Sequence, residues 1–210
     1  RAGKKLTLHD GTTLMYDKLA LCVGAQVRKI DLLGGTLKGV QYLRTLADAE
    51  ALKAQLSPNA KHAVIIGGGY IGLEIAAALR QQGMQVVVLE MAERILQRVT
   101  APEISTFYAR LHAEAGVTIR SNVQISHLVG DTQVRGVVCS DGLEWPADMV
   151  VVGVGVLPNV ALAQAAGITV DQGILVDEYC RSNDPDIVAA GDCTQYFSER
   201  YQRMIRLESV

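Results

Sequence analysis

Residues 63–90 read AVIIGGGYIGLEIAAALRQQGMQVVVLE, and this stretch decides the fold. An apolar run at 63–66 leads into a glycine turn, a helical pattern follows, and a second apolar run at 86–89 ends at an acid. Gly67, Gly69 and Gly72 form a G-x-G-x-x-G motif, with the small residues Ala76 and Gly83 further along the helix. The order strand, glycine turn, helix, strand and acid predicts a dinucleotide-binding βαβ unit.

Each glycine of the motif has its own physical task. Gly67 lets the chain turn sharply off the strand, and Gly69 leaves room for a diphosphate to approach the backbone. Gly72 lets the helix pack close to the sheet. The amides at the helix start, at Tyr70 and Ile71, then face the phosphates, helped by the helix dipole.

Glu90 ends the second strand, close to the expected spacing of about 20 residues after the glycine turn. A carboxylate at this place accepts hydrogen bonds from a ribose diol and repels a 2′-phosphate. The motif therefore favours NAD over NADP.

Length, composition and net charge limit the kinds of function to be expected. The chain has 210 residues, of which 49% are hydrophobic and 5% aromatic, so we expect an aliphatic core of buried parallel strands. A net charge of −2 does not suggest nucleic acid or an acidic membrane as a partner. No apolar run reaches the roughly 18 residues of a membrane helix, and no signal peptide opens the chain.

The cysteines and histidines indicate where the protein is located and argue against a redox-active dithiol and a metal site. The four cysteines form no C-x-x-C pair, which indicates isolated reduced thiols in a cytoplasmic protein and no redox-active dithiol. The four histidines are scattered without ligand spacing, so we expect no metal site.

The pattern along the chain predicts one domain inserted in another. Residues 47–170 are expected to form an α/β, Rossmann-like NAD-binding domain with a parallel sheet, helices and a β-meander at 123–146. Residues 1–46 and 171–210 are expected to be two pieces of a second, FAD-binding Rossmann-like domain. They include a hairpin at 5–14, a strand at 18–23, a strand at 174–176 and a strand at 186–192. The chain opens inside this hairpin and stops without a closing signal, so we expect an internal fragment of a longer polypeptide.

Several stretches together carry a family resemblance that spans nearly the whole chain. They lie at 43–49, 64–74, 94–102, 107–116, 153–159, 182–193 and 206–210. In this order they resemble the FAD-dependent pyridine-nucleotide oxidoreductases, and within these the ferredoxin and rubredoxin reductases of the putidaredoxin reductase type. The resemblance implies a flavoprotein enzyme in which NADH gives a hydride to FAD, which then passes electrons singly to a small iron–sulfur protein. The missing C-x-x-C argues against the disulfide reductases of the family.

The resemblance also assigns residues to FAD. It implies that Arg44 and Asp192 contact FAD and that Val210 lies beside the flavin. The family's Ala-Thr-Gly stands here as Cys-Val-Gly ending at Gly24, which keeps the turn and loses one hydroxyl. The family's first glycine fingerprint, for FAD, is absent from this sequence, so the FAD site is incomplete. We therefore expect the chain to bind NAD weakly and to hold no stoichiometric FAD.

Other candidate residues keep two interpretations. The resemblance implies that Glu74 reaches the nicotinamide carboxamide; the alternative is an acid stabilised by the helix dipole. The resemblance implies that Arg98 lies near the adenosine ribose; the alternative is a solvated surface arginine. Tyr70 either covers a cofactor ring or packs against neighbouring residues. Gly153 either lets the chain approach the cofactor or makes an ordinary tight turn. Asp192 either contacts FAD or caps a helix. No catalytic residue is assigned, because hydride transfer between cofactors needs no protein acid or base.

Two alternative functions stay open. One is a neighbouring flavoenzyme such as an NADH oxidase or a monodehydroascorbate reductase. The other is an NAD-binding module without turnover.

Overall fold

The computed structural model describes residues 1, 3–57 and 59–208, and its chain divides into two compact units. One, the continuous unit, runs from Val27 to Gly155. The other, the divided unit, combines Arg1–Gln26 with the chain from Val156 onward. The chain thus leaves one unit, completes another and returns.

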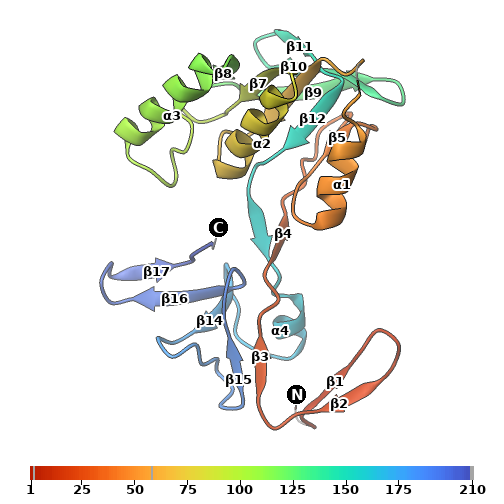
Figure 1. Cartoon of the computed structure of the whole chain (residues 1–210). Helices are drawn as coiled ribbons and strands as arrows, with labels where there is room; N and C mark the ends of the chain where they lie inside the picture. Colours follow the sequence, from red (N-terminus) through yellow and green to blue (C-terminus); the bar gives the residue numbers. More distant parts are fainter. Residues whose placement is uncertain (2, 58, 209–210) are drawn as a thin grey trace. The chain divides into compact units, whose positions relative to one another are not determined.

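A five-stranded parallel sheet forms the centre of the continuous unit (Figure 1). Its strand order is β5, β12, β6, β7, β8, with bounds Val40–Gln41, Met149–Val152, His62–Ile66, Gln85–Leu89 and Val117–Arg120. Helix α2 (Tyr70–Gln81) connects β6 to β7, and α3 (Pro102–Glu114) connects β7 to β8. The predicted βαβ unit is confirmed as β6, α2 and β7, and α3 and β8 extend it.

Alternating side chains send each strand's apolar groups to opposite faces of this sheet. On one face, Ile65 of β6 and Val88 of β7 belong to a cluster with residues of α2 and with Leu52 of α1 (Leu46–Ala54). On the other face, Val64 of β6 belongs to a cluster with residues of the meander. The sheet is therefore covered by helices on one side and by strands on the other.

The meander is the predicted antiparallel sheet in the order β11, β10, β9. Its strands are β9 (Ile125–Gly130), β10 (Val134–Cys139) and β11 (Glu144–Pro146). Val137 in the middle of β10 is fully buried, and it packs in the same cluster as the underside of the parallel sheet. The meander thus supplies the second half of the core of the continuous unit.

The divided unit is held together by a parallel pair between distant segments. Strand β3 (Leu19–Leu21) pairs with β15 (Ile187–Ala189), with Leu21 opposite Ala189. The remaining elements are the hairpin β1–β2 (Lys5–Thr7, Thr13–Met15), the pair β4–β13 (Ala25–Val27, Val156–Pro158), the sheet β14–β16–β17 (Ile174–Val176, Thr194–Ser198, Arg203–Ile205) and α4 (Ala161–Ala165).

The sequence missed some short strands. No strand was predicted at 25–45, where the structure has β4 and β5, and none was predicted for β13, β16 or β17. The compact units change over at 26/27 and 155/156, whereas the predicted domain boundaries were 46/47 and 170/171. The units describe packing alone, so the domain boundaries by function stay a prediction.

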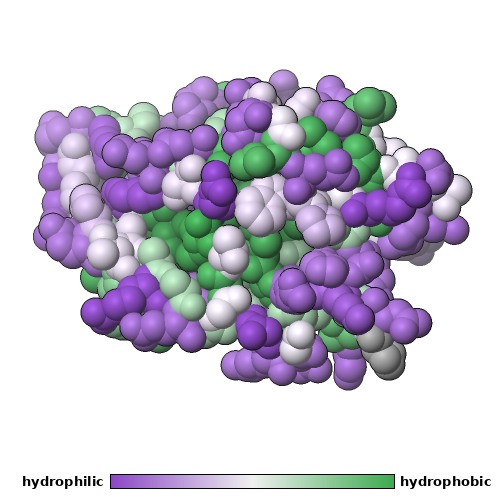
Figure 2. Space-filling view, turned by 90° about the horizontal axis from the view of Figure 1, so that it is seen from above, coloured by the Kyte–Doolittle hydropathy of each residue, from purple (hydrophilic) through white to green (hydrophobic). Residues whose placement is uncertain are grey.

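The surface mixes polar and apolar side chains. Figure 2 shows one face, on which hydrophilic residues predominate at the rim and hydrophobic residues show between them toward the middle. Over the residues that the structure describes, no helix is both long enough and apolar enough to cross a bilayer.

Candidate dinucleotide-binding site

The turn after β6 has a geometry that only glycine accommodates. Gly67 has φ of 107°, and its N–H donates to the carbonyl oxygen of Leu89 at 2.8 Å. A Cβ on Gly67 would lie 2.4 Å from the carbonyl oxygen of Gly153, and a Cβ on Gly72 would lie 2.2 Å from that of Gly67. Backbone therefore meets backbone at two places, which ties the turn to the end of β12 and to the start of α2.

Gly69 differs from these two glycines because no atom lies within 4 Å of the position its Cβ would take. It is the N-cap of α2, and no side chain caps this helix end. The first amides of a helix have no partner within the helix. Tyr70 and Ile71, the first helical residues, are both partly exposed. An open space in front of uncapped amides suits an anion such as a diphosphate.

Glu90 joins the end of β7 to this turn. Its Oε2 accepts a hydrogen bond from the N–H of Gly68 at 2.6 Å, and its Oε1 accepts one from the N–H of Ala92 at 2.7 Å. The two oxygens of a carboxylate offer about four acceptor positions, so Glu90 can still accept hydrogen bonds from the hydroxyls of a ligand. The structure thus brings the predicted acid and the predicted glycine turn together, as a ribose next to a diphosphate would need.

Gly153, Arg98 and Glu74 are other predicted residues of the continuous unit. Gly153 donates its N–H to the carbonyl oxygen of Ile66 at 2.8 Å and lies against Gly67. Arg98 is exposed, and its Nη2 lies 3.5 Å from where a Cβ on Gly155 would stand. Glu74 is exposed on α2.

Two predicted FAD residues follow the carboxyl ends of neighbouring parallel strands in the divided unit. Gly24 follows β3, and Asp192 follows β15, whose pairing continues when Ala190 donates its N–H to the carbonyl oxygen of Leu21 at 3.1 Å. Carboxyl ends of parallel strands meet at one edge, which is where such sheets bind ligands. Asp192 is 7% exposed, and the preceding Gly191 has φ of 86° and open space at its Cβ position.

Asn159 ends the stretch at 153–159 that carries part of the family resemblance, and no role was predicted for it. Its side-chain amide donates to the carbonyl oxygen of Val23 at 2.8 Å, and its N–H donates to that of Gly24 at 2.9 Å. It therefore fixes the turn at Gly24, which has φ of 62°. The sequence signal for it is weak: Asn159 directly follows Pro158, and both residue types are frequent in turns.

The last two predicted FAD residues are Arg44, which the structure describes, and Val210. Arg44 is exposed in the continuous unit, just before α1, and its N–H donates to Oδ2 of Asp48 at 3.0 Å. Val210 lies outside the described residues.

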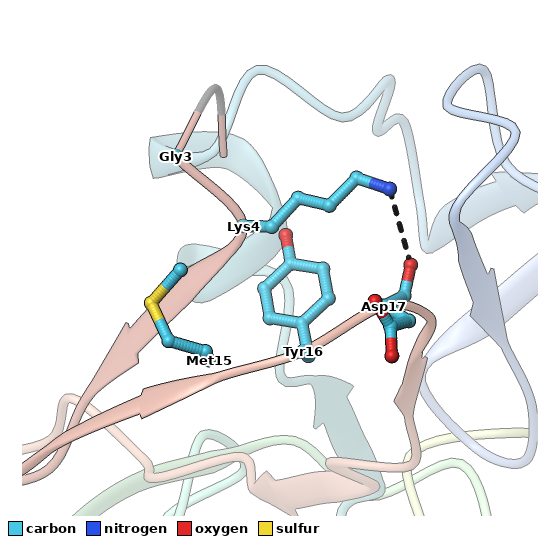
Figure 3. Close-up of a pocket in the computed structure, with 5 residues that line it drawn as sticks. All are labelled: Gly3, Lys4, Met15, Tyr16 and Asp17. Atoms are coloured by element: carbon cyan, nitrogen blue, oxygen red, sulfur yellow. Dashed lines mark hydrogen bonds between the residues drawn. The ribbon is translucent and has the colours of Figure 1, made fainter.

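A separate hollow of about 420 Å³ lies at the base of the β1–β2 hairpin (Figure 3). Lys4 donates to the backbone oxygen of Asp17 at 3.3 Å and pairs with Asp186 at 2.5 Å. Hydrogen bonds from Lys18 and Lys4 lower the pKa of Asp186 to about 2. None of the predicted site residues lines this hollow, whose walls are Gly3, Lys4, Met15, Tyr16 and Asp17.

The sequence of the chain is similar to those of known oxidoreductases. The family model described as pyridine nucleotide-disulphide oxidoreductase matches residues 1–207. Putidaredoxin reductase CamA of Pseudomonas putida is 44% identical over 216 residues, covering 100% of this chain and 51% of that protein. The chain thus spans about half the length of the curated relatives it matches.

Solved structures agree with the fold. The structure of a ferredoxin reductase from Rhodopseudomonas palustris superposes with a TM-score of 0.95 at 44% identity, covering 99% of this chain and 52% of that one. A covalent complex of putidaredoxin reductase with putidaredoxin superposes with a TM-score of 0.92 at 43% identity, covering 99% and 51%. The Rossmann-like α/β fold predicted from the sequence is confirmed.

Proposed function

This chain belongs to the pyridine nucleotide-disulphide oxidoreductase family, and we propose that it is the NADH-binding part of a flavoprotein ferredoxin or rubredoxin reductase. In this proposal NADH gives a hydride to FAD, and single electrons then pass to a small iron–sulfur protein. Support comes from relatives whose names state such reductases, including the rubredoxin-NAD(+) reductase of Pseudomonas putida at 37% identity over 99% of this chain and 54% of that protein.

The contact between Glu90 and Gly68 is the observation that carries the proposal. It places a carboxylate beside a glycine turn whose next residue, Gly69, faces open space. A dinucleotide needs both features close together, because its diphosphate and its adenosine ribose are adjacent. The same carboxylate disfavours a 2′-phosphate, so we assign NADH rather than NADPH.

For FAD, we propose Gly24 and Asp192 of the divided unit as ligands, and that Arg44 contacts FAD is proposed from the family resemblance alone. Gly24 and Asp192 fit this role because they follow the carboxyl ends of β3 and β15, where small residues leave the backbone approachable. The flavin would accept the hydride and release electrons one at a time. The residues named here would bind and orient it, and no protein acid or base is required.

The proposal also covers the domain bounds and the cellular compartment. The NAD-binding domain is proposed to span 47–170, inserted between FAD-domain pieces at 1–46 and 171–210. We place the protein in the cytoplasm, where thiols such as Cys22 and Cys180, both free and exposed, stay reduced. An NADH oxidase or a monodehydroascorbate reductase is the alternative among enzymes, and a non-catalytic NAD-binding module is the alternative outside them.

Two measurements test the function. The chain is titrated with NADH and NADPH, following nucleotide fluorescence; weak but saturable NADH binding with weaker NADPH binding is expected, and no stoichiometric flavin absorption. The protein in which this chain occurs is then assayed with three acceptors. Fast NADH-dependent reduction of a ferredoxin supports the proposal. Oxygen or ascorbyl radical as the best acceptor favours the alternative enzymes, and NADH binding without flavin reduction favours the module.

A further inference from the structure

We propose that Ser105 and Arg94 are positioning residues for the dinucleotide site, because they lock the loop at 91–101 onto the glycine turn. This loop connects β7 to α3 and has no regular secondary structure. The inference rests on the proposed function, since it assigns to this loop the task of holding the NADH diphosphate site in its binding geometry.

Three successive carbonyl groups of the loop are bonded by side chains. Ser105 Oγ donates to the carbonyl oxygen of Ile95 at 2.6 Å, and Thr100 Oγ1 donates to that of Leu96 at 3.3 Å. Arg94 Nη2 donates to the carbonyl oxygen of Gln97 at 3.2 Å. An irregular loop with every one of these carbonyls satisfied has little freedom to rearrange.

Ser105 and Arg94 also bond to each other. Arg94 Nη1 donates to Ser105 Oγ at 2.5 Å, while the same guanidinium reaches Gln97 through Nη2. Ser105 is 3% exposed although it is a polar residue on α3. A buried hydroxyl that both accepts from an arginine and donates to a carbonyl is a fixed anchor between the loop and the helix.

The network holds Leu96 in an unusual conformation. Leu96 has φ of 55°, which is uncommon for a residue with a branched side chain. In this conformation its N–H donates to the carbonyl oxygen of Gly68 at 2.9 Å. The side chains of Ile95 and Leu96 are buried in a small cluster with Leu73 of α2. The loop is therefore attached to the glycine turn by a hydrogen bond and by packing.

As a result, both polar backbone groups of Gly68 are occupied. Its N–H is bonded to Glu90 and its carbonyl oxygen to Leu96. A Cβ on Gly68 would lie 2.7 Å from Cγ2 of Ile95, so the loop also closes over this residue. With Gly68 held on both sides, the following peptide at Gly69 is oriented before a ligand arrives, and pre-organisation of this kind lowers the cost of binding.

The test is a titration of the chain with NADH for three variants. Ser105→Ala is expected to weaken NADH binding roughly three- to tenfold, the range expected for one lost buried hydrogen bond. Arg94→Lys keeps the charge but removes the fork that reaches both Ser105 and Gln97, so it is expected to weaken binding in the same range. Thr106→Ala is the matched control, because the Thr106 hydroxyl is exposed and bonds to Pro102 in its own helix. This variant should bind NADH as the unaltered chain does.

A second readout separates positioning from general destabilisation. Amide hydrogen exchange over 67–72 should speed up in Ser105→Ala and Arg94→Lys, while exchange in β10 stays unchanged. If Ser105→Ala does not fold, Arg94→Lys decides the question alone. NADH binding and turn exchange that match those of Thr106→Ala would overturn the inference. If the unaltered chain fails to bind NADH, the proposed function fails, and the exchange rates still decide whether Ser105 holds the turn.

Discussion

The carboxylate of Glu90 accepts a 2.6 Å hydrogen bond from the backbone N–H of Gly68, a residue 22 positions earlier in the chain. The contact links the ends of two neighbouring strands, β6 and β7, at the place where the glycine turn begins. Glu90 is therefore part of the framework of the turn as well as a candidate ligand of ribose. Its replacement should affect binding by both routes.

Glu90→Ala should weaken NADH binding by about tenfold or more, the loss expected when a charged acceptor is removed from its donors. Rejection of NADPH should relax at the same time, because no carboxylate remains to repel the 2′-phosphate. Fluorescence titrations with both nucleotides measure the two effects. Glu93→Ala serves as the control, since Glu93 is a nearby exposed acid. Unchanged affinities for both nucleotides would remove Glu90 from the site.

Gly69→Ala should separate binding from folding. The added methyl group meets no atom within 4 Å, and Gly69 has φ of −79°, so the free energy of unfolding should change by less than about 1 kcal/mol. NADH binding should nevertheless fall steeply, because the methyl group occupies the space proposed for the diphosphate. Thermal unfolding and NADH titration of the same sample check both halves. Normal NADH binding by Gly69→Ala would contradict the proposed location of the ligand.

Gly72→Ala, in contrast to Gly69→Ala, should lower the stability of the fold. Its methyl group would lie 2.2 Å from the carbonyl oxygen of Gly67, so backbone must move. We expect a loss of about 1–3 kcal/mol in the free energy of unfolding, the usual cost of overpacking. Urea denaturation of the variant against the unaltered chain measures it. A stability equal to that of Gly69→Ala would show that α2 does not pack as closely on the turn as described.

The stability of the chain should fall as the pH drops below about 6.5, the ordinary pKa of histidine. Burial lowers the pKa of His112 on α3, so the unfolded chain binds a proton there more readily than the folded one. The stabilisation is present above the unfolded pKa and is lost on acidification. Thermal melts at pH 7.5 and 5.5 should therefore differ less for His112→Asn than for the unaltered chain. His9→Asn, at an exposed site, should keep the full difference.

The four thiols should divide into two classes on alkylation. Cys22 and Cys180 are exposed, whereas Cys139 and Cys193 are buried. Burial also raises the pKa of the Cys139 thiol, which lowers its thiolate fraction at neutral pH. Iodoacetamide treatment of the folded chain, followed by peptide mass spectrometry, should label the first two alone, and denaturant should expose all four. Equal labelling of Cys139 and Cys22 before denaturation would mean that β10 is not packed in the core.

The sequence predicted well where local patterns suffice. The apolar runs around the glycine motif are confirmed as β6 and β7, with α2 between them, because period and turn residues agree there. The two-residue strand β5 has no such signal and exists because Val40 pairs with Val150 of β12. Leu96 likewise looks like any apolar loop residue. Its left-handed conformation lies between the carbonyls of Ile95 and Gln97, which Ser105 and Arg94 bond, and its N–H bonds to Gly68 of the glycine turn. Contacts of this kind arise only when distant segments meet.

The parallel pair of β3 and β15 sets the order in which the molecule can assemble during translation. Lys18 and Asp186, which form an ion pair beside this strand pair, are 168 positions apart. At a synthesis rate of about 5–20 residues per second, β3 leaves the ribosome roughly 8–30 seconds before its partner. The residues of the continuous unit are synthesised in that interval, before β3, with Leu19 and Leu21, can pair with β15. Nascent chains stalled before β15 should therefore be the species most dependent on chaperones.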